Sequence, residues 1–293
     1  MAKNLKYYFQ KAQKEGFAIG QFNFSDFTQM KAAVNKSAEL KSPLILGTSE
    51  GESKFFGLEE AVALRDVLRK KTGLPIFLNL DHGKTFEYLR KAIDAGYDMV
   101  HFDGSKLSLE ENIKITKGVV AYASAGWQMH KVLVEGEVGK IGTDSSKIYH
   151  EKFEIKEEDL TRPEDAKEYM QKTRADLLAV SVGNFHGIEG SGIDPHLRLD
   201  TLADIKKTLG DVLLVLHGGS GTHAEDIQDA IKLGVVKINI NTELRLAFSG
   251  NLRRFLDENK DEIVPYKFLL APQKSAENLV GFKIKLFGSA GKV

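Results

Sequence analysis

The sequence of 293 residues contains no cysteine, only six prolines, and as many basic as acidic side chains, 41 of each. Without cysteine the chain forms neither disulfides nor thiolate metal sites, and it has no thiol nucleophile. Zero net charge argues against a nucleic-acid partner, which normally requires a basic excess. No apolar run approaches the roughly 18 residues of a membrane span, and the first residues lack the apolar core of a signal peptide. We therefore expect a cytoplasmic protein with no membrane partner.

Eight short apolar runs rich in β-branched residues recur along the chain, at 17–23, 43–49, 75–81, 99–105, 132–137, 177–183, 212–218 and 236–241. Such runs are typical of parallel strands covered on both faces. Segments with helical spacing lie between most of them, at 29–40, 58–69, 86–95, 109–125 and 224–233. This alternation predicts an α/β fold, a single (β/α)8 TIM barrel over residues 1–293. A doubly wound open sheet is the alternative, but its usual Gly-rich turn after the first strand is replaced here by QFNFSDF.

Two stretches depart from the alternation. Residues 143–162 form a polar loop after the fifth strand, longer than a usual βα loop, and we expect an active-site cover there. At its end Thr161 is expected to cap the next helix, with Glu164 returning the hydrogen bond. After the eighth strand, a helical stretch near 243–259 leads to a C-terminal helical extension over about 260–293.

Polar residues gather where the strands end, which is where (β/α)8 barrels carry their chemistry. Three histidines, His82, His186 and His217, follow the third, sixth and seventh strands, and each precedes a glycine. A single histidine near a strand end is more often a polar residue without a function. Three imidazoles from separate strands, however, form a Zn²⁺ ligand set with one position open for substrate. His101 lies inside a strand, where packing is the better expectation.

Asp81 stands directly before His82 and suggests a second function at the same place. A carboxylate there could transfer a proton to an oxygen near the metal, or it could orient a histidine. On a regular strand the two side chains would face opposite ways, so both reach the site only if the chain turns at Gly83.

The motif HGGSG at 217–221 opens a helix, and its backbone N–H groups and the Ser220 hydroxyl suit a phosphate group. Asn239 to Thr242 follow the eighth strand. Loops after the last two strands are where such barrels often hold phosphate, so the two motifs together predict a phosphate site.

Taken together, these motifs resemble the zinc-dependent class II fructose-bisphosphate aldolases, including the tagatose-bisphosphate branch. The shared elements are Phe22-Asn23, SPLILGTSEG, LDHG, DGS followed by EEN, VEGEVG, the HG after strand six, HGGSG, KINxNTELR and KIKLFGSAGK. The resemblance covers nearly the whole chain. It implies a carbon–carbon lyase that cleaves a phosphorylated ketose to dihydroxyacetone phosphate and an aldehyde, and that forms a homodimer or homotetramer.

The resemblance also implies roles for single residues. His82, His186 and His217 become ligands of a catalytic Zn²⁺, and Asp81 exchanges a proton with the C4 hydroxyl of the substrate. Asp103 and Glu137 match a second or alternative zinc site, and a monovalent cation is also compatible with the family. The implied substrate contacts are Asn23, Ser49, Gly187, Gly218, Gly219, Ser220, Asn239, Asn241 and Thr242, with Ser49 near the second phosphate.

Three positions bear on the substrate and on proton transfer. Asn241 favours fructose 1,6-bisphosphate, since the tagatose branch tends to have alanine there. Ser145 occupies the position of the family's loop glutamate, so we expect Asp144 to move the proton of dihydroxyacetone phosphate. Tyr266 occupies the position of the arginine that meets the far phosphate in many members, and Lys267 is expected to replace it.

Several alternatives remain at this point. A Schiff-base aldolase on the same barrel would use Lys237, inside the eighth strand. A metal-dependent barrel hydrolase would carry a close H-x-H pair on an early strand, and this sequence has none. Cleavage of tagatose bisphosphate, or of another ketose phosphate with a different aldehyde, is open, as is a phosphosugar-binding homologue with weakened catalysis.

Overall fold

The computed structural model describes residues 4–125, 131–142, 145–150, 153–189 and 195–293. Eight parallel strands close into a barrel, in the order β1-β2-β3-β4-β5-β7-β9-β10 around its circumference. They are β1 (Ile19–Asn23), β2 (Leu44–Ser49), β3 (Ile76–Gly83), β4 (Met99–Phe102), β5 (Leu133–Val138), β7 (Leu177–Val180), β9 (Leu213–Leu216) and β10 (Val235–Ile240). Each corresponds to one of the eight apolar runs, and the predicted TIM barrel is confirmed. β6 (Ile148–Tyr149) and β8 (Ile188–Glu189) pair separately.

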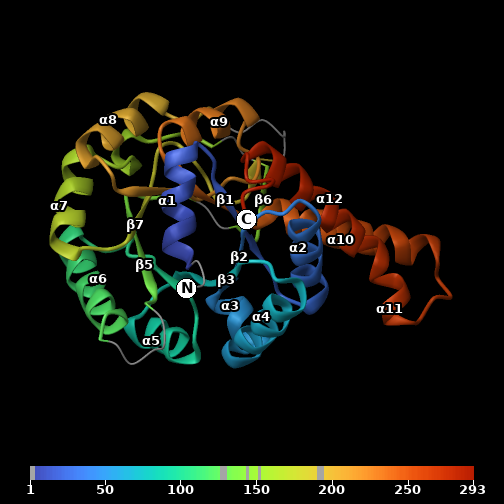
Figure 1. The fold of residues 1–293 in the computed structure, drawn as a ribbon. Helices are drawn as coiled ribbons and strands as arrows, with labels where there is room; N and C mark the ends of the chain where they lie inside the picture. The colour runs from blue at the N-terminus through green and yellow to red at the C-terminus, as the bar shows by residue number, and fades with distance from the viewer. Residues whose placement is uncertain (1–3, 126–130, 143–144, 151–152, 190–194) are drawn as a thin grey trace.

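The helices surround the barrel, as Figure 1 shows. They are α1 (Leu5–Glu15), α2 (Phe27–Glu39), α3 (Glu50–Phe56), α4 (Leu58–Thr72), α5 (Phe86–Ala95), α6 (Leu109–Ala123), the 3-10 helix η1 (Glu157–Asp159), α7 (Pro163–Thr173), α8 (Leu199–Leu209), α9 (Ala224–Lys232), α10 (Thr242–Glu258), α11 (Pro265–Phe268) and α12 (Leu270–Leu286). α10, α11 and α12 form an arm that projects from the barrel wall (Figure 1). No helix of the described part is both long and apolar enough to cross a membrane.

Local signals explain most helix starts, and one expectation about them is wrong. Ser108 and Glu111 form a capping box at the start of α6, which satisfies two otherwise unpaired backbone N–H groups. α7 begins after Arg162 with no side-chain cap. Thr161, expected as that cap, instead joins β5 to β7: its hydroxyl bonds the Val138 carbonyl and accepts the Ser181 N–H. Pro163 at the first helical position fixes the start of α7 instead.

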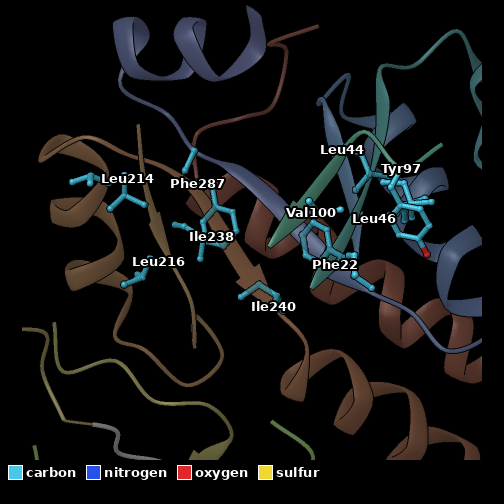
Figure 2. Packing of buried hydrophobic residues seen from close by; sticks show 14 of the residues in the cluster. Phe22, Leu44, Leu46, Tyr97, Val100, Leu214, Leu216, Ile238, Ile240 and Phe287 are labelled. Carbon is cyan, nitrogen blue, oxygen red and sulfur yellow. The ribbon is translucent and has the colours of Figure 1, made fainter. Parts of the chain in front are cut away.

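The strands alternate between two environments because successive side chains point to opposite faces. Even-numbered side chains such as Phe22, Leu46, Val100 and Ile238 pack outward against the helices, and Figure 2 shows this layer at close range. Odd-numbered side chains point into the barrel. At one end of it they are apolar and form a second cluster with α1: Ile19, Ile45, Phe77, Met99, Leu133, Leu177 and Leu213. α1 therefore closes this end with Leu5, Tyr8, Phe9 and Ala12, and polar side chains are left for the other end.

A buried ion pair under the helical layer should contribute strongly to stability. Arg65 of α4 donates to Asp98 at 2.6 Å, and both side chains are less than a tenth exposed. We expect Arg65→Met to lower the free energy of unfolding by about 3 kcal/mol, because Asp98 loses a buried partner. Urea unfolding measures this. Lys172→Met, which breaks an exposed pair with Glu168, is the control and should cost less than about 0.5 kcal/mol. Equal effects of the two changes would contradict the assignment.

Candidate active site

A cavity opens at the carboxyl ends of the strands. Its lining residues are Asp81, His82, Ser145, His186, Gly187, His217, Gly218, Ser220, Asn239, Asn241 and Thr242. All but Ser145 were singled out from the sequence, and Ser145 was noted as the residue in place of the family's loop glutamate. The closed barrel brings together side chains that are far apart in the chain, as the strand-end argument predicts.

The local backbone of β3 directs both Asp81 and His82 toward this cavity. The register between β3 and β4 shifts between Leu80 and Gly83, and His82 has the left-handed φ of +51°. Only a few per cent of non-glycine residues adopt such a φ, and they concentrate at functional sites. The expected turn therefore exists, but it is made at His82 itself and not at Gly83.

Glu135 of β5 determines how His217 is presented. Both residues are fully buried, and the Nε2 atom of His217 lies 2.6 Å from Oε1 of Glu135. The second oxygen of Glu135 accepts from Nζ of Lys237 at 2.8 Å. Burial alone would raise the pKa of Glu135, but Lys237, His101 and His217 outweigh it and hold the pKa well below its usual range. Since a carboxylate only accepts, Nε2 of His217 carries the proton and Nδ1 keeps its lone pair.

His82 is held in a matching way from the other side. Its Nδ1 lies 3.1 Å from the carboxylate of Asp103, so this nitrogen is the donor, and in the neutral ring that a metal requires Nε2 keeps the lone pair. Nε2 of His82 and Nδ1 of His217 then face each other at 3.0 Å. Two lone pairs at this distance repel unless a cation or a proton lies with them. Two imidazole nitrogens on a tetrahedral zinc would be about 3.3 Å apart, given Zn–N bonds of about 2.0 Å. The pair therefore fits a divalent metal ion.

Two further imidazoles complete the cluster. The ring centroid of His186 lies 4.6 Å from that of His82 and 5.8 Å from that of His217. His101 is fully buried, its Nδ1 accepts the backbone N–H of His82, and its Nε2 lies 3.2 Å from Glu137. His101 is thus buried, as expected, and it also contacts His82 and Glu137 of the site.

Acidic and imidazole donors converge in two groups among the described residues. Asp81, His82, His101 and His217 form one group, and His82, Asp103 and Glu137 form the other. The second group matches the expected alternative metal position. Burial lowers the pKa of His217 to about 3, so its lone pair is available at neutral pH. Burial, with the carboxylate of Asp103, raises the pKa of Glu137 against the opposing effect of His101.

Asp81 is held by two asparagine side chains. Asn23 donates to one carboxylate oxygen and Asn239 to the other, each at 2.9 Å. Burial would raise the pKa of Asp81, but the positive charge available to His82 and the nearby His101 ring hold it well below its usual range. Asp81 is therefore an ionised base with a fixed orientation. Both asparagines were expected to bind substrate; here each donates to Asp81.

Glycines shape the end of the cavity where phosphate is expected. Gly218 has a φ of +64°, and a side chain there would collide with the backbone of Phe185. Ser220 is buried, and its hydroxyl accepts the backbone N–H of Glu243 at the start of α10. Thr242 donates its hydroxyl to the Ser145 carbonyl at 2.8 Å, which ties the long loop to the cavity rim.

The structure does not bring every expected residue to the cavity. Lys267 lies on α11 in the projecting arm, half exposed, where it pairs with Glu262 at 3.2 Å. Asp144 falls outside the described residues. Ser49 is adjacent to the site, where its hydroxyl accepts the backbone N–H of Glu52 and its own N–H donates to the Glu52 carboxylate.

Sequence reasoning missed four contributors besides His101. They are Glu135, Glu52, Arg245 and the amide of Gln21, which donates to Asn23 at 2.9 Å. A signal did exist for two of them: Glu135 and Gln21 stand two residues before Glu137 and Asn23, and so share their face of the strand. Lys237, proposed as a Schiff-base lysine, shares that face too, but it is ion-paired to Glu135 and does not line the cavity.

The chain was compared with known proteins. The family model for "Fructose-bisphosphate aldolase class-II" matches residues 3–292. A 6-phospho-5-dehydro-2-deoxy-D-gluconate aldolase of Shouchella clausii is 38% identical over 96% of this chain and 92% of its own. A fructose-bisphosphate aldolase of Helicobacter pylori is 33% identical over 97% of each chain. The crystal structure of the YdjI aldolase from Escherichia coli K12 superposes with a TM-score of 0.82 at 28% identity, covering 100% of this chain and 99% of that one.

A parallel barrel with buried imidazoles and carboxylates at its carboxyl end is the architecture of a metal-dependent barrel enzyme. Within that class, the chain belongs to the class II fructose-bisphosphate aldolase family. It is accordingly an aldehyde-lyase, and this family is generally metal-dependent.

The contact between Asp103 and His82 can be tested by metal binding. We expect Asp103→Asn to weaken the affinity for Zn²⁺ about 10- to 100-fold, because the carboxylate that sets the His82 tautomer is lost. Competition with a chromophoric chelator, on metal-stripped protein, measures the affinity. Asp229→Asn, on the surface of α9, is the control with the same chemical change. Unaltered affinity in Asp103→Asn would show that His82 needs no carboxylate partner.

Proposed function

We propose that the protein is a Zn²⁺-dependent aldolase that reversibly cleaves a ketose 1-phosphate to dihydroxyacetone phosphate and an aldehyde. The observation that carries this proposal is the pair of opposed imidazole nitrogens of His82 and His217, 3.0 Å apart, with the ionised Asp81 in the same cavity. His186 is proposed as the third ligand, since its ring lies beside that of His82. Asp103 and Glu137 are proposed as an alternative metal position.

The proposed reaction breaks the bond between C3 and C4 of the ketose. Asp81 accepts the proton of the C4 hydroxyl, the aldehyde carbonyl forms at C4, and the electron pair passes to the C2 carbonyl oxygen. A bound divalent cation supplies positive charge at that oxygen, worth several kcal/mol. The amides of Asn23 and Asn239 keep the carboxylate of Asp81 in place throughout.

The carbanion carbon must then be protonated to give dihydroxyacetone phosphate. We propose Asp144 for this step, as the sequence suggests. Its neighbour Ser145 lines the cavity, and the Ser145 carbonyl accepts from Thr242 at 2.8 Å and from Arg245 at 3.1 Å. The proposal is supported by this anchoring of the adjacent residue at the cavity rim.

Fructose 1,6-bisphosphate is the substrate that Asn241 favours from the sequence. The relatives named above act, by their names, on different phosphorylated compounds, so similarity alone leaves the aldehyde half open. The half that becomes dihydroxyacetone phosphate has the firmer support, because Gly187, Gly218 and Ser220 line the cavity beside the imidazoles.

Replacing Asp81 tests the proposed chemistry. We expect Asp81→Asn to lower kcat for ketose phosphate cleavage by about 10²- to 10⁴-fold, because the amide cannot accept the C4 proton. Release of dihydroxyacetone phosphate, followed with a coupled dehydrogenase, gives the rate. Asp94→Asn on the exposed face of α5 is the control. The zinc proposal fails if thorough chelation leaves the wild-type rate intact.

The arm supports the proposal that the protein forms a homodimer or larger homo-oligomer. It carries large apolar side chains in water: Ile263 is 83% exposed, Tyr266 73% and Leu270 62%. Apolar side chains grouped on one projection are typical of a protein–protein contact. We propose that this surface packs against a second copy.

A charge placed on this surface should disrupt the oligomer. We expect Ile263→Asp to shift the mass measured by light scattering after size exclusion toward that of one chain, 32.5 kDa. A buried carboxylate at the contact would be desolvated without a partner. The control is Val67→Asp on α4, another exposed apolar residue. An unchanged mass in Ile263→Asp would place the contact elsewhere.

A further inference from the structure

Glu52 is a buried carboxylate that the proposed mechanism does not use, and it lies beside the active site, in contact with the cavity-lining Asn241. It stands in the first turn of α3, directly after β2, and is 6% exposed. One of its oxygens accepts from the backbone N–H of Ser49 at 2.8 Å and from the Asn23 amide at 3.1 Å. The other accepts from Arg245 at 2.6 Å and from the Asn241 amide at 3.5 Å.

Three partners of Glu52, namely Asn23, Ser49 and Asn241, are residues that the sequence predicts to contact the substrate. β10, β1 and β2 are neighbours in the barrel. Asn23, Ser49 and Asn241 stand at the carboxyl ends of these strands, so they lie in the same sector of the barrel rim. Asn23 joins this sector to Asp81, which in the proposed mechanism accepts the proton of the C4 hydroxyl. C4 becomes the carbonyl carbon of the aldehyde. Ser49, expected near a second phosphate, has both its N–H and its hydroxyl engaged with Glu52.

The guanidinium that contacts Glu52 is already engaged. Arg245 is the cation that contacts it, and its guanidinium is already shared between Glu52 and the Ser145 carbonyl. Lys267 pairs with Glu262 on the arm, and Tyr266 stands exposed where a family arginine would be. A phosphate placed against Glu52 would meet a buried carboxylate whose guanidinium partner is already engaged. Like charges brought together in this way oppose binding strongly.

We propose that Glu52 makes this aldolase select an aldehyde without a phosphate group, namely an uncharged hydroxyaldehyde. Its hydroxyl groups can donate to the Glu52 carboxylate and accept from the neighbouring amides, whereas an anionic aldehyde is repelled. The proposal rests on the proposed function, because it specifies the second product of the same cleavage. It makes a ketose 1-phosphate a better substrate than the corresponding 1,6-bisphosphate.

The test compares two aldehydes that differ only by phosphate. Wild type and Glu52→Gln are assayed for condensation of dihydroxyacetone phosphate with glyceraldehyde and with glyceraldehyde 3-phosphate. We expect the wild type to favour glyceraldehyde in kcat/KM by about tenfold or more, and Glu52→Gln to shift the ratio about tenfold toward glyceraldehyde 3-phosphate, because the substitution removes the negative charge beside the phosphate. Because each ratio is measured on one preparation, partial loss of folded protein cancels.

Glu50→Gln is the matched control, since Glu50 lies on the same helix and pairs with Lys54 at 3.0 Å. It should leave the ratio unchanged. A wild type that prefers glyceraldehyde 3-phosphate, or a ratio that Glu52→Gln does not move, overturns the inference. Exchange of the dihydroxyacetone phosphate proton with solvent is measured in parallel. Exchange without condensation with either aldehyde also overturns the inference, whereas absence of both reactions overturns the proposed function.

Discussion

The buried carboxylate of Glu135 is the interaction on which the site depends. It lies inside the barrel between two partners, His217 at 2.6 Å and Lys237 at 2.8 Å. A buried charge is tolerated only when it is paired and hydrogen-bonded. Removing Lys237 would therefore leave the Glu135 carboxylate buried without a compensating charge, and removing Glu135 would do the same to Lys237. The same contact places the proton of His217 on Nε2. It thereby turns the other nitrogen toward His82, and it keeps Lys237 as a structural ammonium ion below the cavity.

The barrel interior explains why this pair can exist at all. Odd-numbered side chains of the strands point inward, and those nearest α1 are apolar. One layer further along the strands stand Gln21, Asn79, His101, Glu135 and Lys237, all fully buried. Asn79 donates to Gln21 at 2.8 Å, and Gln21 donates to Asn23, which holds Asp81. This polar layer therefore lies between the apolar cluster next to α1 and the catalytic end of the barrel, and its hydrogen bonds hold Asp81 in place.

Much of this arrangement was predictable from the sequence. The eight apolar runs became the eight strands, and most of the cavity-lining residues stand at their ends, because closing a parallel barrel brings these ends together. The polar layer was predictable in principle, since each of its members stands two residues before a strand-end residue. It was missed because the runs were interpreted as apolar throughout, so that His101 was taken for a packing residue.

Other features depend on tertiary contacts that no local pattern contains. The left-handed φ of His82 arises where β3 and β4 shift register, and nothing in LDHG distinguishes a turn at His82 from one at Gly83. Glu52 looks like an ordinary capping-box residue, and its capping role is real. Its contacts with Asn23 and Arg245 span 29 and 193 positions along the chain, so only the closed barrel gives it a place beside the substrate.

The distribution of charge along the cavity follows from these contacts. Around the imidazoles stand four carboxylates, those of Asp81, Asp103, Glu135 and Glu137, and Lys237 pairs with one of them. This donor set suits the divalent cation of the proposed mechanism. At the aldehyde end one carboxylate and one guanidinium neutralise each other. A substrate charged at one end and neutral at the other therefore matches the cavity better than one with a phosphate at each end.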